Sequence, residues 1–178
     1  MKGWPDVAEA FRPPQGKIPM APAFRRKRNR LPLDSYNGVR AYFLTLTSAQ
    51  RKPIFRDQGM VAACLGELDL SSERCGFTVL VYCFMPDHLH LLVQGDDEAD
   101  LPRFVKDFKQ RTGYAYGRAN AKALWQKSYH DHVVRAEEDI EDIARYIVGN
   151  PVRASLADAP ADYPYSGSFV WGRSILEA

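Results

Sequence analysis

Two apolar segments joined by a short turn constrain the fold of this chain more than any other feature. They cover residues 78–84 and 89–94, and residues 85–88 separate them. Pro86 in that turn fixes its own backbone dihedral and favours a tight reversal of the chain. The two segments are therefore predicted to pair as a buried antiparallel hairpin. Neither approaches the roughly 20 apolar residues of a membrane-spanning helix.

The segments around this hairpin alternate between strand and helix patterns. Residues 40–47 and 124–135 are rich in aromatic and β-branched side chains, which is typical of strands. Apolar residues recur with helical spacing in residues 57–70, 101–118 and 137–149. The resulting order βαββαβα predicts an α+β, ferredoxin-like fold, with an antiparallel four-stranded sheet and the helices on one face.

The composition indicates a chain with an ordinary hydrophobic core. Of its 178 residues, 46% are apolar, 12% aromatic and 26% charged, which excludes a globally disordered, collagen-like or coiled-coil protein. One domain is predicted over residues 39–178, preceded by an arm over residues 1–38. No apolar run is long enough to cross a membrane, and the start lacks a secretory signal. We therefore expect a cytoplasmic, nucleoid-associated protein without a membrane partner.

The predicted arm carries a dense block of positive charge after a proline-rich stretch. The four prolines among residues 13–22 exclude a helix or an inner strand there. The cations that follow are Arg25, Arg26, Lys27, Arg28 and Arg30. Such a block either stays solvated or contacts the phosphates of a nucleic acid, and the charge density serves both roles equally well. We take these cations as candidate DNA contacts.

All four histidines occur in two pairs of the form His-x-His, His88 with His90 and His130 with His132. Residues i and i+2 of a strand project from the same face, so each pair can converge on one point. Neutral imidazole is a common ligand of divalent metals, although an isolated pair is more often a coincidence on a solvated face. His88 and His90 begin a buried strand, where a rigid sheet would preorganise a metal site.

Tyr146 and Asn150 lie four residues apart at the end of the last predicted helix, so their side chains share one side of it. A tyrosine phenolate can attack phosphorus, but its ordinary pKa of about 10 requires a nearby cation. From spacing alone Tyr146 is more simply a tyrosine at the boundary of the core. Tyr114, Tyr116 and Tyr129 are rival nucleophiles.

Three blocks of the sequence resemble one family. MPDHLH at residues 85–90 resembles the HUH motif (histidine, hydrophobic residue, histidine) of single-tyrosine transposases, with Asp87 where asparagine is common. Trp125 and Gln126 resemble the family's "WQ" strand, and YIVGNPVR at residues 146–153 resembles its "YI..NPV" block. Together, in this order, the three blocks resemble the REP-associated tyrosine transposases.

This resemblance implies a site-specific single-strand DNA endonuclease and strand transferase that acts at REP-type hairpins through a 5′-phosphotyrosine intermediate. Its biological outcome would be DNA transposition or REP mobilisation. The resemblance selects Tyr146 as the nucleophile and implies that His88, His90 and Asn150 bind Mg²⁺ or Mn²⁺. It also implies a monomer whose partner is single-stranded or hairpin DNA.

Further candidate DNA contacts are Lys109, Arg111, Trp125, Gln126 and Arg153. Cations neutralise phosphates and give DNA binding a steep salt dependence. Trp125 offers a stacking surface worth roughly 1–3 kcal/mol per base, although a tryptophan in a central strand usually packs in the core. A tyrosine on a helix reaches the scissile phosphate only in structured or single-stranded DNA, because an undistorted duplex would first have to open.

Two other interpretations stay open at this stage. The chain could be a catalytically inactive, ferredoxin-like nucleic-acid-binding module, a role for which the fold is well suited. The intact set of His88, His90 and Tyr146 argues against this alternative. The chain could instead hold a four-histidine metal site built from both histidine pairs, which metal stoichiometry would test.

Overall fold

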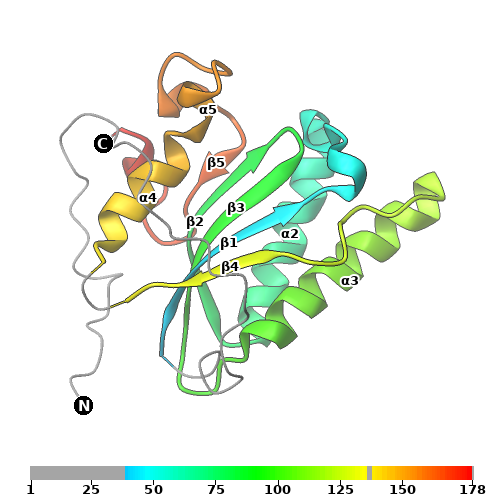
Figure 1. Ribbon diagram of the computed structural model, residues 1–178, viewed down its shortest axis with the longest axis horizontal. Coiled ribbons are helices and arrows are strands. Elements are labelled where there is room, and N and C mark those ends of the chain that lie inside the picture. The colour runs from blue at the N-terminus through cyan, green and yellow to red at the C-terminus, as the bar shows by residue number, and fades with distance from the viewer. Residues whose placement is uncertain (1–38, 136–137, 178) are drawn as a thin grey trace.

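Five antiparallel strands form one sheet with the spatial order β4-β1-β3-β2-β5 (Figure 1). The computed structural model describes residues 39–135 and 138–177. The strands are β1 (Ala41–Thr47), β2 (Phe77–Met85), β3 (His88–Gly95), β4 (His130–Val133) and β5 (Ser166–Gly167). The helices are α2 (Gln58–Arg74), α3 (Leu101–Asn120), α4 (Ile140–Val148) and α5 (Asn150–Arg153). In this described part of the chain, no helix combines the length and apolar character that a bilayer crossing demands.

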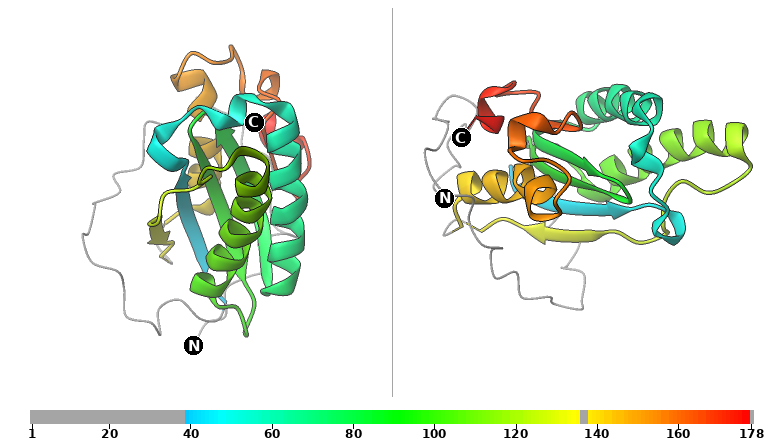
Figure 2. Two further views of the ribbon diagram at one scale, coloured as in Figure 1. Left: turned by 90° about the vertical axis from the view of Figure 1, so that its right-hand side faces the viewer. Right: turned by 90° about the horizontal axis from the view of Figure 1, so that it is seen from above.

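The α+β class and the predicted order of elements are confirmed, but the prediction of four strands with all helices on one face is corrected in two details. A fifth strand, β5, pairs with Tyr82 and Cys83 of β2. Its two residues are too few to carry a strand pattern in the sequence. α2 and α3 cover one face of the sheet and α4 covers the other (Figure 2). The apolar stripe of α4 packs on the second face because α2 and α3 already bury the first.

The fourth predicted strand is also shorter than expected. Only β4, out of the predicted residues 124–135, pairs along β1. Before β4, a single bridge between Trp125 and Ser48 attaches the chain to the sheet. Trp125 turns into the core at this point, where its Nε1–H donates to Oγ1 of Thr112 at 2.8 Å. This inward turn interrupts the strand.

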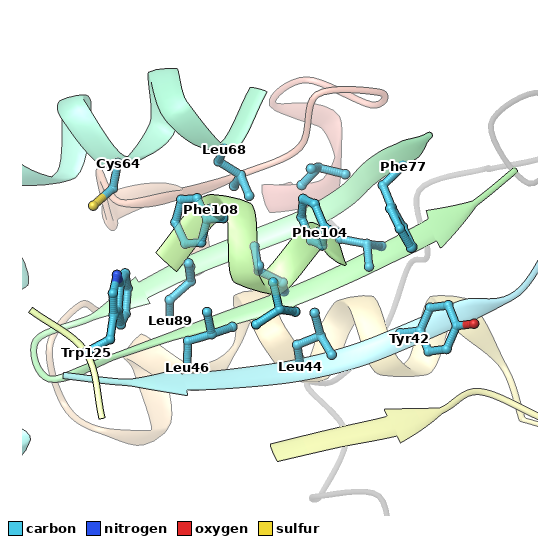
Figure 3. Packing of buried hydrophobic residues seen from close by; sticks show 14 of the residues in the cluster. Tyr42, Leu44, Leu46, Cys64, Leu68, Phe77, Leu89, Phe104, Phe108 and Trp125 are labelled. Carbon is cyan, nitrogen blue, oxygen red and sulfur yellow. The ribbon is translucent and has the colours of Figure 1, made fainter. Parts of the chain in front are cut away.

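α2 and α3 bury one face of the sheet in a core of alternating strand residues and helix stripes (Figure 3). The rings of Phe77 and Phe104 stack at 4.9 Å between centroids. Each fully buried apolar side chain contributes roughly 1.5–3 kcal/mol, so this face anchors the sheet. Its members include Tyr42, Leu44, Leu46, Cys64, Leu68, Phe77, Leu89, Phe104, Phe108 and Trp125.

A bulge at Leu80 decides which residues of β2 face α4. The pairing of β2 with β3 shifts register between Val79 and Val81, and an extra residue reverses the alternation of a strand. Val79 therefore faces α2 and α3, whereas Val81 and Cys83 face α4. Because Cys83 pairs with His90, the bulge sets the surroundings of that histidine.

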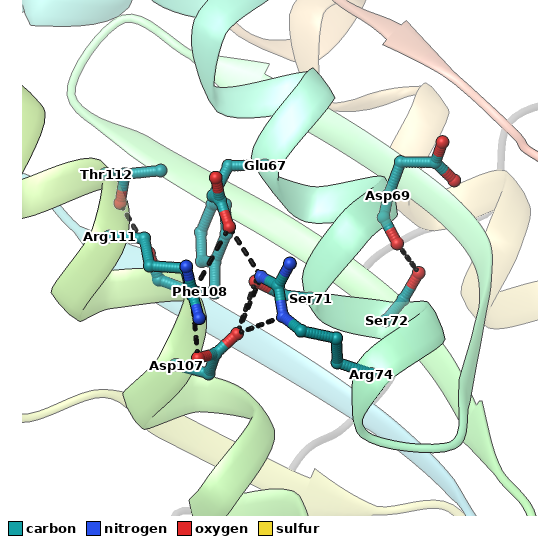
Figure 4. Close-up of polar contacts among 9 residues, drawn as sticks. All are labelled: Glu67, Asp69, Ser71, Ser72, Arg74, Asp107, Phe108, Arg111 and Thr112. Atoms are coloured by element: carbon teal, nitrogen blue, oxygen red, sulfur yellow. Dashed lines mark hydrogen bonds and ion pairs between the residues drawn. The ribbon is translucent and has the colours of Figure 1, made fainter.

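A cluster of charged side chains joins α2 to α3 on their outer side (Figure 4). Asp107 on α3 accepts hydrogen bonds from Arg74 Nη2 (2.8 Å) and Ser71 Oγ (3.0 Å) on α2, and from Arg111 Nε (2.9 Å). Burial raises the pKa of Asp107, but the hydrogen bonds from these three partners outweigh it and lower that pKa to about 2. The carboxylate is therefore a stabilising contact between the two helices.

Asp107→Asn is expected to lower the free energy of unfolding by about 1 kcal/mol at pH 7. Because the pKa of Asp107 is depressed in the folded state, its contribution is present above the unfolded pKa of about 3.9 and is lost as the pH falls toward 2. Urea unfolding of the unmodified protein and of the Asp107 variant at pH 7 and at pH 3 measures the difference in their free energies of unfolding. Asp97→Asn, which removes an exposed carboxylate, is the control. An identical difference at both pH values would contradict the assignment.

Candidate active site and metal ligands

β3 places His88 and His90 on the face of the sheet that α4 covers. Leu89 and Leu91 face the α2 and α3 core, while Leu92 packs in the cluster under α4. Strand alternation therefore directs both imidazoles toward the α4 side. The two Nε2 atoms lie 3.1 Å apart. His90 is 8% exposed and His88 is half-buried.

Each imidazole is also held at its Nδ1 atom. Oδ1 of Asp87 lies 2.6 Å from Nδ1 of His88, and a carboxylate can only accept, so this nitrogen carries the proton. In a neutral His88 ring, Nε2 then carries no proton, and its lone pair is available. Oγ1 of Thr45 lies 2.9 Å from Nδ1 of His90. Arg51 donates to the second oxygen of Asp87 at 3.3 Å. An imidazole backed by a carboxylate is typical of metal ligands.

Burial and nearby charges keep His90 in the neutral form that binds a cation. Burial lowers the pKa of His90 to about 3, and the nearby charges of His88 and Arg153 lower it as well, against a smaller opposite effect of Asp87. Burial raises the pKa of Asp87, but its hydrogen bond and charge interaction with His88 and the charge of Arg51 outweigh this and lower that pKa. His90 is thus neutral and Asp87 ionised.

The donor set of the two histidines fits a divalent metal. A cation about 2.1 Å from two nitrogens, and bonded to them at a right angle, needs those nitrogens about 3.0 Å apart. The Nε2 atoms of His88 and His90 are separated by 3.1 Å. Nitrogen ligands favour manganese over magnesium, which prefers oxygen.

α4 brings Tyr146 to the same face of the sheet. The ring of Phe43 lies 5.5 Å from the ring of His90 and 6.1 Å from the ring of Tyr146, measured between centroids. One aromatic side chain therefore contacts both the histidine and the tyrosine. The guanidinium of Arg153 lies 4.3 Å from the centroid of the Tyr146 ring, and Nη2 of Arg153 donates to the backbone carbonyl of Tyr146.

Asn150 begins α5, directly after the helix that carries Tyr146. Its Nδ2 donates to the backbone carbonyls of Tyr146 (3.0 Å) and Ile147 (3.1 Å), which satisfies carbonyls that a helix end leaves open. Carbonyl acceptors require a donor, so these bonds also determine which side-chain atom is nitrogen. The remaining oxygen, Oδ1, is the atom that could bind a cation. The structure thus brings Asn150, Tyr146 and Arg153 together.

Lys109 and Gln126 lie together beside β1. Nζ of Lys109 donates to the backbone carbonyls of Gln126 (2.7 Å) and Lys127 (2.9 Å). The backbone N–H of Gln126 donates to the carbonyl of Thr47 at 2.9 Å, and Thr47 pairs with His88 across β1 and β3. β1 therefore lies between Gln126 and the strand that carries His88.

Arg111 and Trp125 lie away from the imidazoles. Arg111 belongs to the charged cluster between α2 and α3, on the opposite face of the sheet, so its contact with DNA stays a prediction. Trp125 is 8% exposed, and its indole packs against Phe55 (5.2 Å) and Phe108 (5.7 Å). These core rings cover most of the indole, and the stacking of Trp125 on a base stays a prediction. The five cations of the arm, and with them the arm's boundary, lie outside the described residues.

The second histidine pair shares this sheet face but lies apart from the first. His130 pairs with Thr45, which pairs with His90 on its other side, so two interstrand spacings of about 4.8 Å separate their backbones. Nε2 of His132 lies 2.8 and 2.9 Å from the carboxylate oxygens of Glu138. Within residues 39–135 and 138–177, no three His, Cys, Asp or Glu side chains form a metal-binding group. The alternative of a four-histidine site is therefore wrong.

Sequence reasoning missed Thr45 and Arg51. Gln50 and Arg51 both adopt a left-handed backbone, with φ of 58° and 53°, which costs roughly 1–2 kcal/mol for a residue with a Cβ atom. This strained turn directs Arg51 to Asp87. Neither residue carries a sequence signal, whereas the position of Asp87 directly before His88 could have suggested its role.

The family model described as "Transposase IS200 like" matches residues 40–150, which is more than half of the chain. The chain therefore belongs to the IS200-like transposase family.

Within this family, the predicted resemblance to REP-associated tyrosine transposases is confirmed. A Haemophilus influenzae protein named "Putative REP-associated tyrosine transposase" is 28% identical over 111 residues, covering 53% of this chain and 60% of that protein. The chain thus spans less than two thirds of this relative. A solved structure of a REP-associated tyrosine transposase bound to a REP hairpin has the same fold, with a TM-score of 0.66, 19% identity, and coverage of 80% of this chain and 82% of the other.

Proposed function

We propose that this protein is a metal-dependent, site-specific single-strand DNA endonuclease and strand transferase that acts at REP-type hairpins. The observation that carries the proposal is the convergence of two Nε2 atoms, 3.1 Å apart, on the sheet face where α4 presents a tyrosine. Phe43 contacts both groups. An inactive binding module would not require an imidazole pair backed by Thr45 and Asp87.

His88, His90 and the side-chain oxygen of Asn150 would hold the metal ion. When bound there, Mn²⁺ or Mg²⁺ would polarise a nonbridging phosphate oxygen and offset the negative charge of the pentavalent phosphorus. The nitrogen ligands favour Mn²⁺, and we expect activity with both ions. The buried, neutral His90 needs no deprotonation before it binds.

Tyr146 supplies the nucleophile. Its phenol oxygen loses its proton to water and forms a bond to phosphorus as the bond from phosphorus to the 3′ oxygen breaks. The departing oxygen takes up a proton from water to become a 3′ hydroxyl. The product is a 5′-phosphotyrosine, which retains the energy of the cleaved linkage. Attack by the same or another 3′ hydroxyl reverses the step and rejoins DNA. Arg153, whose guanidinium lies over the Tyr146 ring, favours negative charge on the phenol during the attack.

The DNA partner is a hairpin with a single-stranded flank, and the protein acts as a monomer. The half-buried Tyr146 extends from a helix end against the sheet, so only an unpaired strand can bring its phosphate to the phenol. Lys109 and Gln126 would contact the DNA beside the site, and Arg153 would contact the scissile region.

A covalent-adduct assay tests this function. A REP-type hairpin with single-stranded flanks, drawn from palindromic repeats near the gene, is labelled at its 3′ end and incubated with the protein and Mn²⁺. The 3′ label is needed because the downstream fragment stays on the tyrosine. We expect a labelled band at the mass of protein plus DNA under denaturing conditions, and its loss with chelator. Tight binding without any adduct would instead support the inactive binding module.

Asp87→Ala is expected to weaken the binding of Mn²⁺ roughly 10–100-fold, because the loss of the carboxylate releases the ring of His88. Calorimetric titration with Mn²⁺, without DNA, measures the affinity. Asp142→Ala is the matched control, since it removes a carboxylate that pairs with Arg145 instead. Equal affinity in the Asp87 variant and the unmodified protein would exclude a supporting role for Asp87.

A further inference from the structure

An open groove lies between α3 and the segment that returns from α3 to β4. Its volume is about 670 Å³. Lys106, Lys109 and Gln110 line it from α3, and Gln126, Lys127 and Tyr129 line it from the returning segment. The groove is distinct from the imidazole pair, which lies on the α4 side of the sheet.

The charge of the groove has one sign. Three lysines line it, and none of its described lining residues is acidic. Lys106 and Lys127 are exposed on opposite walls. Lys109 joins the walls through its bonds to two backbone carbonyls of the returning segment. A groove with this charge attracts an anionic ligand.

The groove also offers an aromatic surface. Tyr129 is half-buried in its wall, with the ammonium of Lys109 5.9 Å from the centroid of its ring. Cations combined with an accessible aromatic ring are typical of proteins that bind single-stranded nucleic acid, because bases stack on the ring while lysines contact the phosphates. The volume matches that of small-molecule pockets and holds a few nucleotides rather than a duplex.

One wall of the groove lies beside the strand that neighbours the first histidine. Gln126 in its wall donates its backbone N–H to Thr47, and Thr47 pairs with His88. The backbone of Gln126 therefore lies about two interstrand spacings, close to 10 Å, from the backbone of His88.

We propose that this groove binds the single-stranded DNA flank that continues from the hairpin into the active site. The inference rests on the proposed function and adds the position of the flank. Lys106 and Lys127 contact its phosphates from the two walls, and Tyr129 stacks on one of its bases.

The test compares two DNAs and two double variants. The DNAs are a hairpin with a single-stranded flank and the same hairpin without it. Lys106→Gln with Lys127→Gln removes the two exposed groove cations, and Arg103→Gln with Arg118→Gln removes two exposed cations of α3 outside the groove as the matched control. Fluorescence anisotropy at several salt concentrations gives each affinity.

The groove variant is expected to lose about tenfold in affinity for the flanked hairpin. The slope of log affinity against log salt concentration should become shallower by about 1.4, or 0.7 for each lost phosphate contact. Its affinity for the trimmed hairpin should match that of the unmodified protein. Equal losses for both DNAs would overturn the proposal by assigning the groove to the stem, and no loss for either would show that the groove does not bind DNA. Adduct formation by the unmodified protein is scored separately, so a failure of the proposed function is distinguishable from a failure of the groove.

Discussion

Tyr146→Phe is expected to abolish the covalent protein–DNA adduct while leaving hairpin affinity within about twofold. The substitution removes only the hydroxyl, so the ring keeps its contacts with Phe43 and Arg153. A loss of chemistry without a loss of binding is the signature of a group that acts in the reaction itself. Denaturing electrophoresis with the 3′-labelled flanked hairpin measures the adduct, and anisotropy measures binding.

Other tyrosines provide the controls for this experiment. Tyr114 is 67% exposed on α3, on the other side of the sheet from α4, and Tyr114→Phe should form the adduct at the normal rate. Tyr116→Phe should also form it, because Tyr116 lies on α3 as well and packs against the core on that face. An adduct that persists in Tyr146→Phe and disappears in one of these variants would move the nucleophile to another tyrosine and refute the proposed site.

His90→Ala is expected to weaken Mn²⁺ binding by more than 100-fold and to eliminate cleavage, a larger effect than that of Asp87→Ala. The substitution removes one of the two converging Nε2 atoms and leaves His88 as a single imidazole. Losing a direct ligand costs more than losing a group behind it, for which the cost is roughly 10–100-fold. Titration of Mn²⁺ without DNA and the adduct assay with saturating DNA measure the two effects independently.

His130→Ala is the matched control, because His130 shares the sheet face and lies two strands from His90. It should bind metal normally. Because His90 is buried, its replacement also leaves a cavity, and His90→Gln with thermal unfolding separates this cost from the loss of a ligand. A folded His90 variant that binds Mn²⁺ as tightly as the unmodified protein would remove His90 from the metal site.

The parts of the site that lie close together in the sequence could be predicted from it. Strand periodicity puts His88 and His90 on one face whatever the rest of the fold does, and helical spacing puts Tyr146 near Asn150. Asp87 stands where the family usually has asparagine, and its position beside His88 makes a hydrogen bond possible. The structure shows that bond.

The residues that could not be assigned were those whose environment depends on distant segments. Trp125 was a candidate for stacking on DNA, but Phe55 and Phe108 enclose it. In the sequence Arg111 does not differ from the other cations of α3, whereas the structure places Glu67 of α2 beside it. Arg51 carried no signal, because its approach to Asp87 depends on a strained turn.

The order of strands and helices, the central hairpin and the three blocks that resemble the transposase family follow from residues near one another along the chain. The position of α4 on the face opposite α2 and α3, which puts the tyrosine and the imidazoles on the same side of the sheet, depends on the packing of distant segments. A helix stripe specifies an apolar surface to bury but not the surface against which it is buried. That choice follows from the face left open by the other helices and from the bulge in β2, which places Cys83 on the α4 face of the sheet.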